Sequence, residues 1–295
     1  PAEGNQRVVK IFATGNAFAA LRSDGSVVTW GASFNGGDSS KVAESLASGV
    51  VDVVSSGAAF AALRTNGEVV TWGSASEGSD SSGVSNSISS GVMQVVANRG
   101  AFAALKTNGA VVTWGRAEYG GDSSLTGYGL SNGVVRVVPN AFAFAALKED
   151  GSVVTWGDAT KGGDAGVMAS QLTLGVKDLF PLSYAFAALK SDGSVVAWGD
   201  AGNGGDSSAG NDLLASGVVT LATPFQNNRW VPGNALGGVA VVSNAATTNQ
   251  GAWQYSHNGF DWSNVPARPA NSSALVLDNN TQLRFAPATN FVGSP

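Results

Sequence analysis

The stretch AFAALRSDGSVVTWG, residues 17–31, decides the fold, because close copies of it occur four more times in the chain. The copies are AFAALRTNGEVVTWG (59–73), AFAALKTNGAVVTWG (101–115), AFAALKEDGSVVTWG (143–157) and AFAALKSDGSVVAWG (185–199). One tryptophan marks each copy, and successive tryptophans are 42 residues apart. An unbroken period of this size indicates a repeat architecture.

Each repeat contains three short apolar segments that predict β-strands. The first is β-branched, as in VVKIF (8–12) and VVDVV (50–54), and the other two are the AFAAL and VVTWG segments. Asp-Gly or Asn-Gly joins the second segment to the third. This dipeptide between apolar runs predicts a β-hairpin, because glycine tolerates the positive φ of the turn.

Three strands and a loop in 42 residues predict either a β-propeller blade or one rung of a stacked β array. Strands that are apolar on both faces favour the propeller, and the small alanines of AFAAL suggest that this strand is innermost, near a narrow axis. We therefore predict an all-β fold with five blades in residues 1–225. A sixth copy of the first strand, VVTLA (218–222), is expected to meet the first blade and close the ring. An open array is the alternative.

A polar loop follows the tryptophan of each repeat and carries an aspartate at one fixed repeat position. Such an aspartate can cap a turn by accepting a hydrogen bond from the backbone N–H two residues on. Calcium binding is the alternative, and no other cofactor is expected. These residues are Asp38, Asp80, Asp122, Asp164 and Asp206.

The tryptophans are expected to pack in the core. A basic residue before each turn predicts a solvated ring, with anion binding as the alternative. The ring residues are Arg22, Arg64, Lys106, Lys148 and Lys190.

Candidate binding residues lie where the repeats differ. The linker between the first and second strands carries Arg99, Phe142 and Tyr184, and the loop after the tryptophan carries Phe34 and Tyr119. Arginine and aromatic side chains on the loops of a rigid frame are typical contact residues. Sequence drift at tolerant positions is the alternative.

Composition excludes several classes of function. The net charge is −5, which argues against a nucleic-acid partner. No apolar run is long enough to span a membrane. The chain has no cysteine and a single histidine, His257, at a predicted hairpin tip, so we expect no enzymatic activity and no metal site of the zinc type.

Segments such as ALRSDGSVVTWG (20–31) resemble the repeats of the regulator of chromosome condensation family. The resemblance covers residues 8 to about 222 and implies β-propeller blades, usually seven in that family. A secreted bacterial β-lactamase inhibitor protein of the same superfamily has blades of similar compactness. The Gly-Gln-Leu-Gly segment of the family is here GGDSS, for example at 36–40, and only five repeats are present. Nucleotide-exchange activity is therefore not expected to carry over.

Residues 226–295 lack the 42-residue period and alternate short strands with turn clusters. The segment WQYSHNGFDW (253–262) predicts a hairpin that turns at Asn258-Gly259. This region is similar to the cadherin-like or immunoglobulin-like modules of large bacterial adhesins. It is short for such a module, so we expect a small β-sandwich-like domain that is truncated or completed by a partner.

Low charge, the missing cysteines and these modules suggest a segment of a longer extracellular bacterial surface protein. We expect it to act in adhesion, or as a building block of a fibre, through protein or glycan contacts and through copies of itself placed end to end. The alternative is a propeller that binds one soluble protein, as an inhibitor does.

Overall fold

The computed structural model describes residues 7–208, 214–216, 218, 239–241, 251–256, 263–264, 275–277 and 282–287. By its contacts the chain divides into two compact units. The first unit comprises Pro1–Ser191 and Val196–Asn211, and the second comprises Asp192–Val195 and Asp212–Pro295.

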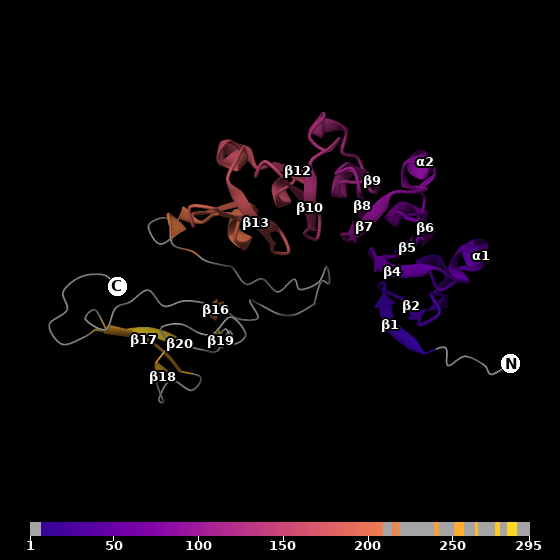
Figure 1. Ribbon diagram of the computed structural model, residues 1–295, viewed down its shortest axis with the longest axis horizontal. Helices are drawn as coiled ribbons and strands as arrows, with labels where there is room; N and C mark the ends of the chain where they lie inside the picture. The colour runs from indigo at the N-terminus through magenta and orange to yellow at the C-terminus, as the bar shows by residue number, and fades with distance from the viewer. Residues whose placement is uncertain are drawn as a thin grey trace. The chain divides into compact units, whose positions relative to one another are not determined.

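The repeats form five three-stranded antiparallel sheets in which the strands follow one another in sequence order (Figure 1). The first strands are β1 (Val8–Ala13), β4 (Val50–Ser55), β7 (Val92–Ala97), β10 (Val134–Pro139) and β13 (Val176–Pro181). The second strands are β2 (Ala17–Arg22), β5 (Ala59–Arg64), β8 (Ala101–Lys106), β11 (Ala143–Lys148) and β14 (Ala185–Lys190). The third strands are β3 (Val27–Gly31), β6 (Val69–Gly73), β9 (Val111–Gly115), β12 (Val153–Gly157) and β15 (Val195–Gly199). The predicted all-β class with five propeller-type blades is confirmed.

The Asp-Gly turns form as the sequence predicts. In the first blade, Gly25 has φ +76°, and the Asp24 carboxylate accepts hydrogen bonds from the Ser26 backbone N–H (3.0 Å) and hydroxyl (2.6 Å). The turn therefore needs glycine for its backbone and aspartate for its hydrogen bonds.

In each blade, short helical turns follow the third strand. The first turns are η1 (Ser33–Asn35), η3 (Ala75–Glu77), η5 (Ala117–Tyr119), η7 (Ala159–Lys161) and η9 (Ala201–Asn203). Beyond them lie η2 (Ser40–Val42), α1 (Ala43–Leu46), η4 (Ser82–Val84), α2 (Ser85–Ile88), η6 (Ser124–Thr126) and η8 (Gly166–Leu172). Leu46 and Ile88 from α1 and α2 are buried and help to cover the sheets.

The core lies between successive blades and repeats with the sequence. Phe60 of β5 stacks on Trp72 of β6, with ring centroids 5.2 Å apart, and both side chains are buried against the first blade. The Trp72 indole Nε1–H donates to the Gly36 carbonyl of that blade at 3.0 Å. The same bond occurs at Trp114, Trp156 and Trp198. The predicted core role of the tryptophans is confirmed for these four.

The prediction that AFAAL is the innermost strand is wrong. AFAAL forms the middle strand of each sheet. The first strands of neighbouring blades contact one another directly, as in the bond from the Ser55 hydroxyl to the Ala13 carbonyl (2.7 Å). The reason why this strand is rich in alanine is different. The middle strand is covered on both faces, and the small side chains of Ala17 and Ala19 leave room for the aromatic rings of the next blade.

Closure of the ring by the fifth blade is not seen in the described residues. The side of the first blade that would receive it is open, with Trp30 44% exposed. Of the predicted closing strand, 218–222, only Val218 is described, and its N–H donates to the Gly193 carbonyl (3.0 Å).

The second unit contains two further sheets. Strand β16 (Val239–Val241) pairs with β19 (Leu275–Leu277). Strand β17 (Gly251–Ser256) lies between β18 (Ser263–Asn264) and β20 (Gln282–Pro287). The pairing of Tyr255 with Ser263 agrees with the hairpin predicted over 253–262. His257 and Asn258-Gly259 lie outside the described residues.

Candidate binding face

One end of the blades carries the linkers between the first and second strands and the turns that follow the third strands; we call it the linker-loop face. A ladder of backbone hydrogen bonds joins its linkers from blade to blade. Gly15 N donates to Gly57 O (2.9 Å), Gly57 N to Arg99 O (2.8 Å), Arg99 N to Ala141 O (3.3 Å) and Ala141 N to Ser183 O (3.2 Å). The loops are thus held as one surface.

Buried polar side chains tie the linkers of the second, third and fourth blades to the turns beside them. The Asn98 side chain accepts from the N–H groups of Gly100 (3.1 Å) and Ala101 (2.9 Å) and donates to the Tyr119 carbonyl (2.7 Å). Asn140 makes the matching bonds in the fourth blade. Buried amides with all these partners fix a backbone strongly. Side chains on this face therefore project from a rigid base.

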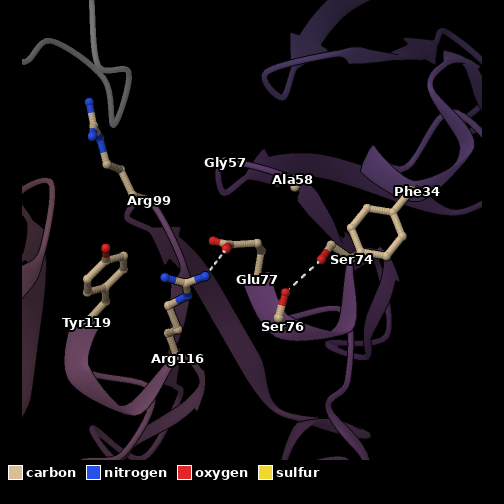
Figure 2. Close-up of a pocket in the computed structure, with 9 residues that line it drawn as sticks. All are labelled: Phe34, Gly57, Ala58, Ser74, Ser76, Glu77, Arg99, Arg116 and Tyr119. Atoms are coloured by element: carbon tan, nitrogen blue, oxygen red, sulfur yellow. Dashed lines mark hydrogen bonds and ion pairs between the residues drawn. The ribbon is translucent and has the colours of Figure 1, made fainter.

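A hollow of about 420 Å³ opens in this face across the first three blades (Figure 2). The Arg116 guanidinium pairs with the Glu77 carboxylate at 2.6 Å, and the Ser74 and Ser76 hydroxyls are hydrogen-bonded at 3.0 Å. Apolar, hydroxyl and charged groups thus share one opening. Its lining residues are Phe34, Gly57, Ala58, Ser74, Ser76, Glu77, Arg99, Arg116 and Tyr119.

A run of aromatic and basic side chains continues from the hollow across the third to fifth blades. The Phe142 ring meets Tyr119 edge-on at 5.0 Å and stacks on Tyr184 at 5.6 Å, measured between centroids. The Arg99 guanidinium lies 5.3 Å from the Phe142 centroid. Lys161 Nζ lies 5.2 Å from the Tyr184 centroid. These distances are typical of aromatic pairs and of cation–π contacts.

The basic groups of this run are partly balanced by acids. Lys161 is hydrogen-bonded to Asp200, and this bond raises the pKa of Lys161 and lowers the pKa of Asp200. Arg116 stacks over Tyr119 at 5.3 Å while it pairs with Glu77. The face is thus polar and aromatic with mixed charge.

The five residues predicted for binding therefore gather on one face. Phe34, Arg99 and Tyr119 line the hollow, and Phe142 and Tyr184 extend it. Phe34 is 71% exposed.

Sequence reasoning missed Glu77, Arg116, Lys161 and Asp200. Their signal was present, because they occupy the same variable turns as Phe34 and Tyr119. Tyr128, on the longer loop of the third blade, is exposed and lies outside the set that lines the hollow.

The repeated aspartates cap turns, as predicted. Asp122 Oδ1 accepts from the Ser124 backbone N–H at 2.8 Å, and this bond and the Ser124 hydroxyl hold the pKa of Asp122 below its usual value. The matching bonds of Asp38, Asp80, Asp164 and Asp206 measure between 2.8 and 3.0 Å. Within the described ranges, no three histidine or acidic side chains are grouped as metal ligands.

The predicted basic ring mostly makes local contacts. Arg64 pairs with Glu68 at 2.6 Å, and Lys106 and Lys190 donate to the carbonyls of Ser87 and Gln171. Across the described part of the chain, no helix has the length and apolar character needed to cross a membrane.

Comparison with known proteins gives structural neighbours and no sequence family. No family profile and no curated protein matches the chain. The ectodomain of the receptor kinase CR4 from Physcomitrella patens is similar, with 19% identity and a TM-score of 0.42, over 68% of this chain and 52% of that one. Human WBSCR16 shares 20% identity, with a TM-score of 0.45, over 66% of this chain and 62% of its own.

A third neighbour is Prp20p from Saccharomyces cerevisiae, whose structure is described with its binding to Gsp1p and histones. It shares 16% identity, with a TM-score of 0.43, over 65% of this chain and 57% of its own. The description of its complex with Kap60 calls it yeast RCC1. The neighbours thus include a member of the family that the hairpin motif resembles. The chain spans between 52% and 62% of the length of these three structures.

Proposed function

We propose that this chain is a non-enzymatic binding protein that recognises another protein through its linker-loop face. One observation carries the proposal: side chains that vary between repeats gather on a base that the repeats hold constant. Arg99, Tyr119, Phe142 and Tyr184 form one cation–aromatic surface beside the hollow. Arginine and tyrosine are the residue types enriched where binding energy concentrates in interfaces.

The geometry favours a protein over a small molecule as the ligand. The hollow is lined by residues of the first three blades (Figure 2). The aromatic run continues over the fourth and fifth blades. Small-molecule sites enclose most of their ligand, whereas this surface is a shallow, extended one. The pairs Glu77–Arg116 and Lys161–Asp200 leave little net charge, so recognition would depend on stacking, shape and hydrogen bonds.

The setting that we propose is the surface of a bacterial cell, where the chain would act in adhesion or as part of a fibre. Support comes from composition: the chain has no cysteine, 13% charged residues and 40 glycines. A second candidate is an inhibitor-like protein with one soluble partner, which the gathering of the variable side chains on one face favours. A glycan ligand is the third possibility, which aromatic rings beside hydroxyl groups would also suit.

Affinity capture tests the proposal directly. The wild-type chain and the variants Arg99→Ala and Phe142→Ala are immobilised, and bound proteins from envelope and secreted fractions of the source cells are quantified. The matched control is Lys106→Ala, a half-buried residue at the opposite end of a blade. We expect a protein that both variants bind roughly tenfold to a hundredfold more weakly, and that the control binds as tightly as the wild type does.

Whether the partner comes from the envelope fraction or from the secreted fraction distinguishes the adhesion role from the inhibitor-like role. An envelope protein supports the adhesion role, and a secreted protein in a one-to-one complex supports the inhibitor-like role. Equal losses in Lys106→Ala and Phe142→Ala, or binding that neither face variant weakens, would refute the linker-loop face as the site.

A further inference from the structure

The first blade has an apolar side that every other blade buries. We call the side of a blade that packs on the preceding blade its rear side, and the opposite one its front side. Five rear positions of the first blade are between 44% and 54% exposed, whereas the same positions of the second blade are at most 8% exposed. They are Val8, Ile11, Phe18, Val28 and Trp30 in the first blade, and Val50, Val53, Phe60, Val70 and Trp72 in the second.

The later blades repeat the buried pattern. Phe102, Phe144 and Phe186 have no exposed surface, while the equivalent Phe18 is 44% exposed. Phe18 and Trp30 still stack on each other, with centroids 5.3 Å apart. The rear side of the first blade therefore has the apolar residues and the Phe–Trp stack that the other blades bury. No described residue packs on it.

The fifth blade shows the complementary end. Ala187 of β14 is half-buried, although the same front-side position is 0% or 1% exposed at Ala19, Ala61, Ala103 and Ala145. Gly36 lies against the Phe60 ring of the next blade, and its copies in the second to fourth blades make the same contact. Around Gly204 in the fifth blade, the corresponding space is reached by Leu182 alone among described residues.

We propose that the front side of the fifth blade of one copy docks on the rear side of the first blade of a second copy, so that copies associate head to tail. The contacts are those that the four internal interfaces already make. Trp30 Nε1–H would donate to the Gly204 carbonyl, as Trp72 does to Gly36. Ser183 N–H would donate to Gly15 O, which extends the ladder of the linkers.

Charge supports the same arrangement. First strands pair across internal interfaces through opposite charges at one repeat position, as in Lys10–Asp52 (2.9 Å) and Arg136–Asp178. In the head-to-tail contact, Asp178 of one copy would lie beside Lys10 of the next. Opposite charges favour this register over others.

A second copy fits better than the residues that follow the fifth blade in this sequence. The chain after residue 199 contains no further AFAAL–VVTWG hairpin that could supply a front side. The fifth blade of the same copy leaves the first blade exposed. Its own Val218 does occupy the Gly193 carbonyl, and Val8 of the second copy would take over that one bond. Such a contact joins unlike surfaces, so it adds copies head to tail, as a closed ring where the rotation closes and as an open chain where it does not.

Sedimentation velocity over protein concentrations from about 1 to about 100 µM tests the proposal. We expect the mean mass of the wild type to rise with concentration in steps of one chain mass. Val28→Glu blocks the first blade and Ala187→Glu blocks the fifth, so each variant alone should remain monomeric. An equimolar mixture of the two should form a one-to-one dimer, because each keeps the end that the other has lost.

The matched control is Val9→Glu. Val9 is 59% exposed, and its copies Val51, Met93 and Val135 are also exposed, so this position belongs to no interface. The control should associate as the wild type does, and circular dichroism should show that all three variants are folded. A wild type that stays monomeric throughout, or a mixture that fails to dimerise, would overturn the proposal. The substituted residues lie outside the linker-loop face, so failure of this test would leave the recognition proposed for that face standing.

Discussion

Replacing a repeat tryptophan by alanine should have very different effects in the first and third blades. Trp114 is 4% exposed, stacks on Phe102 at 5.4 Å and donates its indole N–H to the Gly78 carbonyl at 3.0 Å. Trp30 is 44% exposed and stacks on Phe18 at 5.3 Å, and no hydrogen bond of its indole is seen within the described residues. The two substitutions are chemically identical, so each is the control for the other.

The magnitudes follow from burial. A fully buried indole of about 200 Å² contributes about 5 kcal/mol at 25 cal/mol per Å². Collapse of the neighbouring side chains into the cavity lowers this cost, and the Gly78 carbonyl that loses its donor raises it, so about 4 kcal/mol is expected for Trp114→Ala. Trp30 buries little more than half of its surface, so Trp30→Ala should cost about 2 kcal/mol. The difference in the free energy of unfolding should thus be about 2 kcal/mol.

Urea unfolding followed by circular dichroism measures this difference, at a protein concentration low enough that the chain is monomeric. The variants can be compared where the free energy of unfolding falls with urea concentration at the same slope as in the wild type. The shift of the urea midpoint then reports the change in stability. Equal destabilisation by the two variants would refute the claim that the first blade lacks a neighbour. A cost below about 1 kcal/mol for Trp114→Ala would refute the packing argument itself.

Three further outcomes are expected. Folding lowers the pKa of Asp122, so its contribution is present above the usual value of 3.8 and is lost as the pH falls through the lowered value; the urea midpoints of Asp122→Asn and wild type should converge below pH 3.8. Gly100→Ala would place a Cβ 2.8 Å from Tyr119 Cδ2, so partner affinity measured by calorimetry should fall while the thermal midpoint changes little. Glu77→Gln removes the Glu77–Arg116 ion pair and leaves Glu118 at 3.7 Å from Arg116; it should cost less than about 1 kcal/mol in thermal unfolding and make partner binding more salt-dependent.

The repeat architecture could be predicted because the same local signals recur five times. The Asp-Gly turns, the strands and the capping aspartates are all determined by residues close in sequence. Each repeat therefore predicts its own local structure. The position of AFAAL within the sheet could not be predicted in this way. Small side chains suit a crowded axis and a tightly covered middle strand equally well, and only the packing of Ala17 and Ala19 against the next blade distinguishes them.

The candidate site was predicted as separate positions and not as a surface. Phe142 and Tyr184 occupy the same linker position in neighbouring blades, so their stacking follows from the period once blades pack side by side. Pairs such as Glu77–Arg116 join residues of different blades at different repeat positions. Such pairs depend on the offset between adjacent blades, which the sequence alone does not reveal.

The central claim is that variable residues on the linker-loop face form the recognition surface. Hydrogen exchange of the chain with and without its captured partner tests this claim most directly. We predict protection at residues 98–100, 117–119, 140–142 and 182–184, with exchange unchanged at the Asn-Gly and Asp-Gly turns at 66–67, 108–109 and 150–151. Protection at those turns, with the linkers exchanging as in the free chain, would contradict the account.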